Sequence, residues 1–319
     1  MTIVYNLSVL SSIPPHAAEL LSPDTEPLLR LPALFSIGVH DISYLEQLQK
    51  RKANGSSGPD EELPAQGWVA CTTDEIITSK KSLYDIVVEI PTTYDAPPTK
   101  RKWPTMKNSD GAQIKASQRD LRRWQMLQRE LRRHQHPVGD IDDDDDDDEQ
   151  PDSDTAALLS RKKSADSDHD AHLHLYDDTV VEPTTWTQLA YTGFLWWASA
   201  GYTSSPSPSD LAHDLSLIGD LSDYASSLPT AIIAYFHRST AELIRNLNAL
   251  VERSDDDEEN EYDEDMLVLD GEDVGRLGLD MWSEADRAFL SEFAAMWMGR
   301  GVEVRGRRIE CCGVGVPVF

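Results

Sequence analysis

Residues 67–90, GWVACTTDEIITSKKSLYDIVVEI, contain the pattern that decides the fold class of the first hundred residues. Gly67 to Cys71 is a short apolar run with the length of a buried strand. Thr72 and Glu75 have the spacing of a capping box, in which a hydroxyl and a carboxylate satisfy free N–H groups at a helix start. Leu83 to Ile90, rich in β-branched residues, predicts a second strand. Strand, short helix and strand in this order predict a mixed α/β fold.

Two further strands are expected upstream of this pattern. Ile3 to Leu10 and Ala33 to Val39 contain β-branched and aromatic residues bounded by proline and glycine. Pro97 and Pro98 predict the start of a linker, because proline cannot donate a hydrogen bond to a ladder. Residues 1–99 are therefore predicted to form one α/β part.

The next segment is strongly basic. Residues 100–133 contain 11 basic and three acidic side chains, a net charge of +8. Apolar residues recur there at helical spacing, so residues 100–135 are predicted to hold a linker and a basic amphipathic helix. The recurring residues are Ile114, Leu121, Trp124, Leu127 or Met126, and Leu131.

The basic helix has three interpretations. It can lie on anionic lipid, bind nucleic-acid phosphates, or pack its Trp124 face on the fold with its arginines in solvent. The packed helix is favoured, a contact with a membrane or a protein comes second, and no nucleic-acid partner is expected.

Acidic side chains are concentrated in two segments. Residues 140–154 hold 11 of them and residues 255–273 hold 12, without which the formal net charge of −28 would be −5. Residues 136–181, which include seven consecutive aspartates, have too little apolar surface to offset the entropy of ordering. We predict a disordered acidic linker at 136–181 and an acidic loop at 254–273.

Residues 182–319 are predicted to be mainly helical. Trp186 to Trp197 is apolar nearly all round, which is typical of a buried helix. Leu211 to Tyr224 and Pro229 to Val251 predict two more helices. Ser283 starts a fourth, which ends at Gly299. The core face of the third is predicted to carry Ile233, Phe236, Leu243, Leu247 and Leu250.

The C-terminal residues predict a small closing hairpin, formed by Val302 to Val304 and Arg308 to Cys312 around Arg305-Gly306. Cys311 and Cys312 fit its last strand as small apolar residues. Acylation of these two cysteines, which would attach the chain reversibly to a membrane, is the alternative.

No small-molecule chemistry is indicated by the sequence. There is no phosphate-binding glycine loop, HExxH or GxSxG. The only cluster with metal-ligand residue types is Asp168, His169, Asp170, His172 and His174, and a flexible tract holds metals weakly. We therefore nominate no catalytic, cofactor-binding or metal residues, and expect no cofactor.

The expected location is the cytoplasm. The three cysteines form no disulfide framework, and the N-terminus has no basic signal region. The longest apolar stretch, Leu189 to Tyr202, is shorter than the roughly 20 residues that span a bilayer.

Three of these blocks resemble the central portion of the DENN-module family, in its fungal LCHN-like group. They are LPALFSIGVHDI (Leu31 to Ile42), GWVACTTDEI (Gly67 to Ile76) and LYDIVVEI (Leu83 to Ile90). The blocks at Thr185 to Gly201 and Trp282 to Gly313 are similar to the C-terminal region of the same fungal proteins. The resemblance implies a partial DENN-type module.

The resemblance also implies a function in membrane traffic. Family members regulate Rab-type small GTPases, as guanine-nucleotide exchange factors or scaffolds, without a catalytic triad. DENN modules begin with a longin-like portion, and Met1 already lies inside the central portion. We therefore expect a truncated module or one that works without that half. The alternative function is a non-catalytic interaction protein that uses its acidic loops and basic helix, without a GTPase partner.

Ser254, followed by three aspartates, is a predicted site for an acid-directed kinase.

Overall fold

The computed structural model describes most of the 319 residues, with several gaps. The described ranges are 2–21, 30–54, 67–93, 96–97, 100–135, 180–198, 208–218, 228–256, 266–305, 308–311 and 314–317. The predicted metal-like cluster at residues 168–174, and the linker at 136–179, lie outside these ranges.

The first element is a helix, so the strand predicted at Ile3 to Leu10 is wrong. Helix α1 spans Thr2–Leu10, and a short helix α2 spans Pro15–Ala18. Within α1 the buried residues are Val4 and Ser8, one helical turn apart. Both helices contact the long helix α9, and α1 also contacts the first two strands. Of the β-branched residues in this segment Val4 is buried, whereas Ile3 is exposed.

The predicted strands at Ala33 and Val69 exist, and they pair in parallel. Strand β1 spans Ala33–Ser36 and β2 spans Val69–Cys71. Between them lie a 3-10 turn, η1 (Val39–Asp41), and helix α3 (Ile42–Asn54), which the sequence pattern did not predict.

The short helix after β2 is confirmed, but its cap differs from the prediction. Helix α4 spans Glu75–Ser79, and the side chain of Asp74 accepts a hydrogen bond from the Ile76 amide over 2.9 Å. Thr72 instead accepts from the Asp74 amide over 3.0 Å. The hydroxyl therefore positions the capping aspartate.

A three-stranded antiparallel sheet follows a second 3-10 turn, η2 (Lys81–Leu83). It contains β3 (Ile86–Glu89), β4 (Thr105–Asn108) and β5 (Gln113–Ile114), with β4 in the centre. The linker predicted to begin at Pro97 is thus wrong for the residues that form β4 and β5. Ile114 lies in β5 and not in the basic helix.

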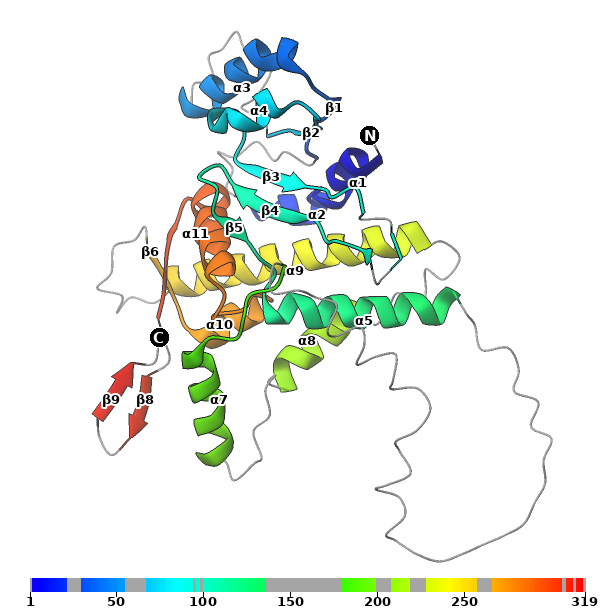
Figure 1. Ribbon diagram of the computed structural model, residues 1–319. Coiled ribbons are helices and arrows are strands. Elements are labelled where there is room, and N and C mark those ends of the chain that lie inside the picture. The colour runs from blue at the N-terminus through cyan, green and yellow to red at the C-terminus, as the bar shows by residue number, and fades with distance from the viewer. Residues whose placement is uncertain are drawn as a thin grey trace, which may run out of the picture.

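Helix α9 (Leu228–Asp256) is the longest helix of the described residues and the centre of their core. Its buried side chains belong to three of the four hydrophobic clusters. In Figure 1 it runs between α1 and α2 on one side and α5 (Gln118–Gln135) with α8 (Pro208–Ile218) on the other. Leu247 and Leu250 are buried as predicted, whereas Phe236 is exposed, because the buried stripe passes through Tyr235.

The C-terminal part builds the largest cluster. Strand β6 (Met266–Leu269) pairs in parallel with β7 (Gly301–Val304), and helices α10 (Gly271–Arg276) and α11 (Glu284–Met298) connect them. The acidic loop predicted at 254–273 is therefore wrong over β6 and the start of α10. Helix α11 has the predicted Ser283 cap, whose hydroxyl accepts from the Asp286 amide. It ends at Gly299 in the left-handed conformation.

The terminal hairpin exists, but its strands differ from the prediction. Strand β8 (Arg308–Cys311) pairs antiparallel with β9 (Val314–Pro317), whereas β7 belongs to the β6 ladder. Cys311 lies in β8, and Cys312 lies outside the described residues.

The mixed α/β class is confirmed, with a mainly helical second part. The prediction of disorder at 136–181 is wrong at Val181, which is buried and bridges in parallel to Ala116. The division into parts at 1–99, 100–135, 136–181 and 182–319 stays a prediction.

Candidate functional site: a charged cleft beside α7

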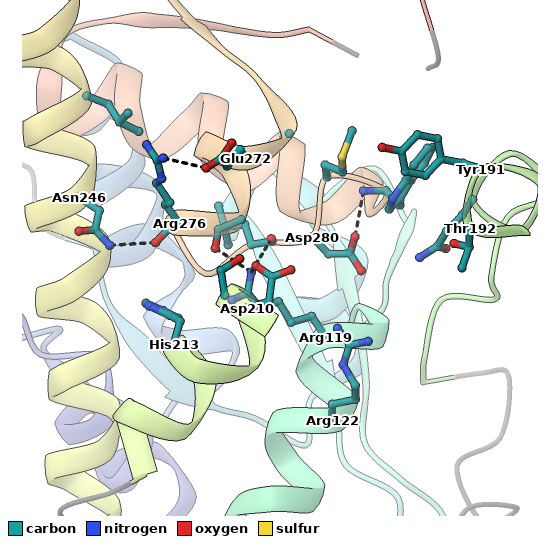
Figure 2. A pocket seen from close by; sticks show the side chains of 18 of the residues that line it. Arg119, Arg122, Tyr191, Thr192, Asp210, His213, Asn246, Glu272, Arg276 and Asp280 are labelled. Atoms are coloured by element: carbon teal, nitrogen blue, oxygen red, sulfur yellow. Dashed lines mark hydrogen bonds and ion pairs between the residues drawn. The ribbon is translucent and has the colours of Figure 1, made fainter. Parts of the chain in front are cut away.

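A cleft of about 830 Å³ lies among helices α5, α8, α9 and α10, with α7 (Trp186–Ala198) as its outer wall. Figure 2 shows Arg119 and Arg122 on the α5 side, and Tyr191 and Thr192 on the α7 side. The lining combines arginines, carboxylates and amides with the indole of Trp282.

A buried ion cluster forms the floor of the cleft. Arg119 and Asp214 are each 3% exposed, and Nη2 of Arg119 donates to Oδ1 of Asp214 over 3.0 Å. Arg123 donates to the same oxygen from Nε over 2.8 Å. Asp210, one turn before Asp214 on α8, lies 3.5 Å from Arg119. Two guanidinium groups and two carboxylates therefore neutralise each other at the junction of α5 and α8.

The same arginines fix the loop after α10. Arg119 donates to the carbonyls of Gly275 and Leu279 over 2.8 and 3.2 Å, and Arg123 donates to the carbonyl of Gly278 over 2.7 Å. Carbonyls at a helix C-terminus lack intrahelical donors, so cationic side chains are well suited to them. Gly278 has φ +81°, and an added Cβ would lie 2.7 Å from Arg123. This turn therefore requires glycine.

The rim opposite α5 holds a second set of ion pairs. Asp273 is nearly buried and receives two hydrogen bonds from Arg253, each 3.1 Å long. Arg276 bonds Glu272 over 2.8 Å, and its carbonyl accepts from Asn246 of α9 (Figure 2). These contacts join α10 to α9, although the side chains of both arginines are more than half exposed.

His213 lies beside the ion cluster with Nδ1 3.7 Å from Glu242. Burial lowers the pKa of His213, Glu242 opposes that shift, and the positive charges of Arg123 and Arg119 add to the lowering. The imidazole is therefore held neutral near physiological pH. It is therefore not a third cation of the cluster.

Asp286, near the start of α11, is the most perturbed carboxyl group. Burial raises its pKa to about 6, while the hydrogen bond from the Asp280 amide, 2.7 Å long, opposes the shift. Asp120, Asp280 and Glu182 add repulsion that also raises it. The carboxyl group is structural, because it caps the loop that carries Trp282.

The outer wall contradicts the prediction that α7 is buried. Tyr191 packs on Trp282 with 5.5 Å between ring centroids, and this inward face lines the cleft. The outward face carries Trp186 and Trp197, which are 86% and 73% exposed. The larger apolar side chains of α7 thus point away from the body.

The arrangement can bind and position charged and polar groups. Arg122 has no ion pair or hydrogen bond to any described residue and lines the cleft, so it can meet an anionic group of a ligand. Across the described ranges, no group of three or more His, Cys, Asp and Glu side chains could hold a metal ion. Nor is any helix in those ranges long and apolar enough to cross a membrane.

The packing expected for the basic helix is partly wrong. Leu127 is buried as predicted, but Trp124 is 39% exposed, while Arg119 and Arg123 point into the fold. The arginines were expected in solvent because an unpaired charge is costly to bury. Asp210 and Asp214 remove that cost. Their i, i+4 spacing matches that of Arg119 and Arg123, and this is the sequence signal that could have identified the cluster.

The other sequence-predicted residues lie apart from the cleft or outside the described ranges. Cys71 ends β2 and is half-buried. Ser254 lies in the last turn of α9 and not in a loop, and its phosphorylation stays a prediction. Acylation of Cys311 and Cys312 also stays a prediction.

Two families match parts of the chain. Residues 1–99 match DENN domain-containing protein 11, and residues 181–317 match a domain of unknown function (DUF4484). The first 99 residues are similar to DENN-related proteins. The unmatched residues between the two regions include β4, β5 and α5, which connect them, because β4 pairs with β3 and α5 packs on α8.

Two fungal relatives are similar to this chain. The uncharacterized protein ANR2 of Saccharomyces cerevisiae is 24% identical over 285 residues, which cover 88% of this chain and 45% of the relative. The uncharacterized protein C119.16c of Schizosaccharomyces pombe is 40% identical over 79 residues, which cover 25% of this chain and 17% of the relative. The chain thus spans less than half the length of these curated relatives. No solved structure matches.

Proposed function

We propose that this protein is a DENN-related regulator of membrane traffic that binds a small GTPase of the Rab type. It acts as an exchange factor or as a scaffold at the cytoplasmic face of vesicle or organelle membranes. The observation that carries the proposal is the match of residues 1–99 to DENN domain-containing protein 11. The motifs that suggested it lie on β1, β2, α4 and β3.

The α/β part offers a surface suited to a protein partner. Ile86 and Val88 of β3, and Ile90 just after it, are all more than two-fifths exposed. Ile86 and Val88 lie two residues apart and so share one face of the strand. Strand β3 is also an edge of its sheet. An apolar face on an edge strand is a feature that proteins usually cover.

An exchange factor must bind the nucleotide-free GTPase more tightly than the nucleotide-bound GTPase. A partner that favours the nucleotide-free GTPase by several kcal/mol shifts the equilibrium toward release, whereas equal affinity for both states shifts nothing. Such a partner acts by contact and needs no catalytic side chain.

The test is a pull-down of nucleotide-free Rab proteins by the full chain, followed by release of a fluorescent guanine nucleotide from each Rab that binds. Val88→Glu should weaken capture, because it places a charge in the proposed contact. Trp124→Glu is a matched control on the far side of α9, and should leave capture unchanged. Absence of binding across the Rab panel would favour the alternative of an interaction protein without a GTPase partner.

That alternative has lost part of its support. That alternative expects the arginines of the basic helix to contact a partner. Arg119 and Arg123 instead donate hydrogen bonds to Asp214 and to carbonyls of the α10 loop. The positive charge available on α5 is correspondingly smaller than its sequence indicates.

A further inference from the structure

Helix α7 has two faces, and the more apolar one points outward. The inward face presents Gln188, Tyr191, Thr192 and Leu195 to the cleft. The outward face carries large exposed side chains on either side of two small residues. These outward residues are Trp186, Leu189, Ala190, Gly193, Phe194 and Trp197, with Trp196 at its border. In Figure 1 the helix projects from the body below α10.

The surrounding sequence contains no charge. From Pro183 to Ser209 there is no Asp, Glu, Lys, Arg or His, although 27% of the whole chain is charged. Depletion of charged residues, with enrichment of tryptophan, is characteristic of the buried centre of a protein–protein interface. The outward face of α7 therefore has the composition of an interface core.

The outward face is symmetric about its own midpoint. Reversing the helix about the point between Tyr191 and Thr192 exchanges Trp186 with Trp197, Leu189 with Phe194, and Ala190 with Gly193. Each exchange pairs residues of similar size. In an antiparallel contact with a two-fold axis at this midpoint, residue i of one copy meets residue j of the other and the reverse, so large side chains would meet large ones and the small residues would meet at the centre.

The small residues lie at the centre of this symmetry. A Cβ added at Gly193 would meet no atom within 4 Å, so the backbone is open to an approaching helix. Small residues at a helix crossing let two backbones come close, and the tryptophans at either end then cover the contact. The exposed aromatic and aliphatic side chains present roughly 700 Å² per chain, close to the ~800 Å² that each partner contributes to an interface of standard size.

We propose that the outward face of α7 forms an antiparallel contact with α7 of a second copy of this chain. The crossing point lies at Ala190 and Gly193, and Trp186 of each copy packs near Trp197 of the other. Because the contact is uncharged, the formal charge of −28 on each chain acts only at a distance and is screened by physiological salt.

A lipid surface fits this face less well. Helices that lie in a membrane interface carry a charged, usually basic face that contacts the head groups. Helix α7 has no charged residue on either face, and the chain is strongly acidic. The observations thus favour protein over lipid.

The test is the mass of the full chain in solution at micromolar concentration, by light scattering or sedimentation equilibrium. The wild type should be a dimer. Gly193→Glu should be a monomer, because it places two like charges at the crossing point. The substitution should not disturb the free chain, since the site is open and glutamate favours helix over glycine.

A charge-reversal pair makes the test specific. Gly193→Lys alone should also be monomeric, whereas an equimolar mixture of Gly193→Glu and Gly193→Lys should restore the dimer. Ile86→Glu, on exposed β3, is the control and should remain dimeric. A monomeric wild type, or a dimer that survives either single substitution, would overturn the proposal. So would a monomeric wild type that sediments with phosphatidylcholine vesicles, which would assign the face to lipid.

Discussion

The Nε atom of Arg123 lies 2.8 Å from Oδ1 of Asp214, joining helix α5 to helix α8 in the interior. Arg119 donates to the same oxygen, and both groups are nearly inaccessible to water. A buried carboxylate that compensates two guanidinium groups cannot be removed without leaving uncompensated charge. The stability of the helical part therefore depends on this one side chain.

Asp214→Ala should lower the free energy of unfolding by about 3–5 kcal/mol, the cost of breaking a buried ion pair. Urea denaturation monitored by circular dichroism measures it. Glu303→Ala removes an exposed partner of Arg305 and is the matched control, with an expected loss of less than ~1 kcal/mol. Equal losses in the two variants would show that the cluster is not buried as described.

Gly278→Ala should destabilise the protein by roughly 1–3 kcal/mol, because alanine is strained at positive φ. Its Cβ would also lie 2.7 Å from Arg123. The control is Gly38→Ala, where φ is −137° and nothing lies within 4 Å of an added Cβ. That variant should be neutral or gain up to ~1 kcal/mol. A neutral Gly278→Ala would mean that the turn relaxes freely.

Asp286 should give the protein a measurable pH dependence. Its pKa is raised from 3.8 to about 6. A raised carboxyl pKa means that the folded state binds the proton more tightly, so this stabilisation is complete below pH 3.8 and is lost as the pH rises through about 6. Asp286→Asn should therefore be more stable than wild type above pH 6, by roughly 2 kcal/mol after allowing for partial exposure.

The measurement is urea denaturation of both proteins between pH 4 and pH 8. The difference between them should grow across the interval from 3.8 to about 6 and level off above it. Glu284→Gln changes an exposed carboxylate in the same helical turn and controls for net charge. If Asp286→Asn and wild type differ by a constant amount at all pH values, the carboxyl group does not titrate in this range.

The fold class could be predicted from the sequence, because β2, α4 and β3 depend on local patterns and local caps. Helix α1 could not, since its β-branched composition favours a strand, and its contacts with α9, β1 and β2 come from distant parts of the chain. Helix α7 was predicted to be buried because of its composition. Composition reports how apolar a helix is, but not whether the chain supplies a partner for both faces.

The residues that form the cleft were harder to predict from the sequence than the fold class was. Arg119 and Asp214 are 95 residues apart, and sequence spacing does not say which distant helix meets α5. The charge count of residues 100–133 treated every arginine as solvated. The buried pair shows that charges on an amphipathic helix can mark its packed face when a complementary pair is available elsewhere.

The final prediction concerns local stability in the α/β part. Leu45 and Leu247 are both fully buried, but Leu45 belongs to a cluster of three buried residues and Leu247 to one of eight. Leu45→Ala and Leu247→Ala remove the same atoms, with an expected cost of about 2–5 kcal/mol each. The consequences should differ, because small clusters can open locally whereas α9 joins three clusters.

Hydrogen exchange followed by mass spectrometry distinguishes the two outcomes. Leu45→Ala should accelerate exchange in β1, α3, β2 and α4, and leave α9 protected. Leu247→Ala should accelerate exchange in α9, β6 and α11 together, because the cooperative core loses stability as a whole. If Leu45→Ala exposes α9 as much as Leu247→Ala does, then the α/β part and the helical part unfold as one unit.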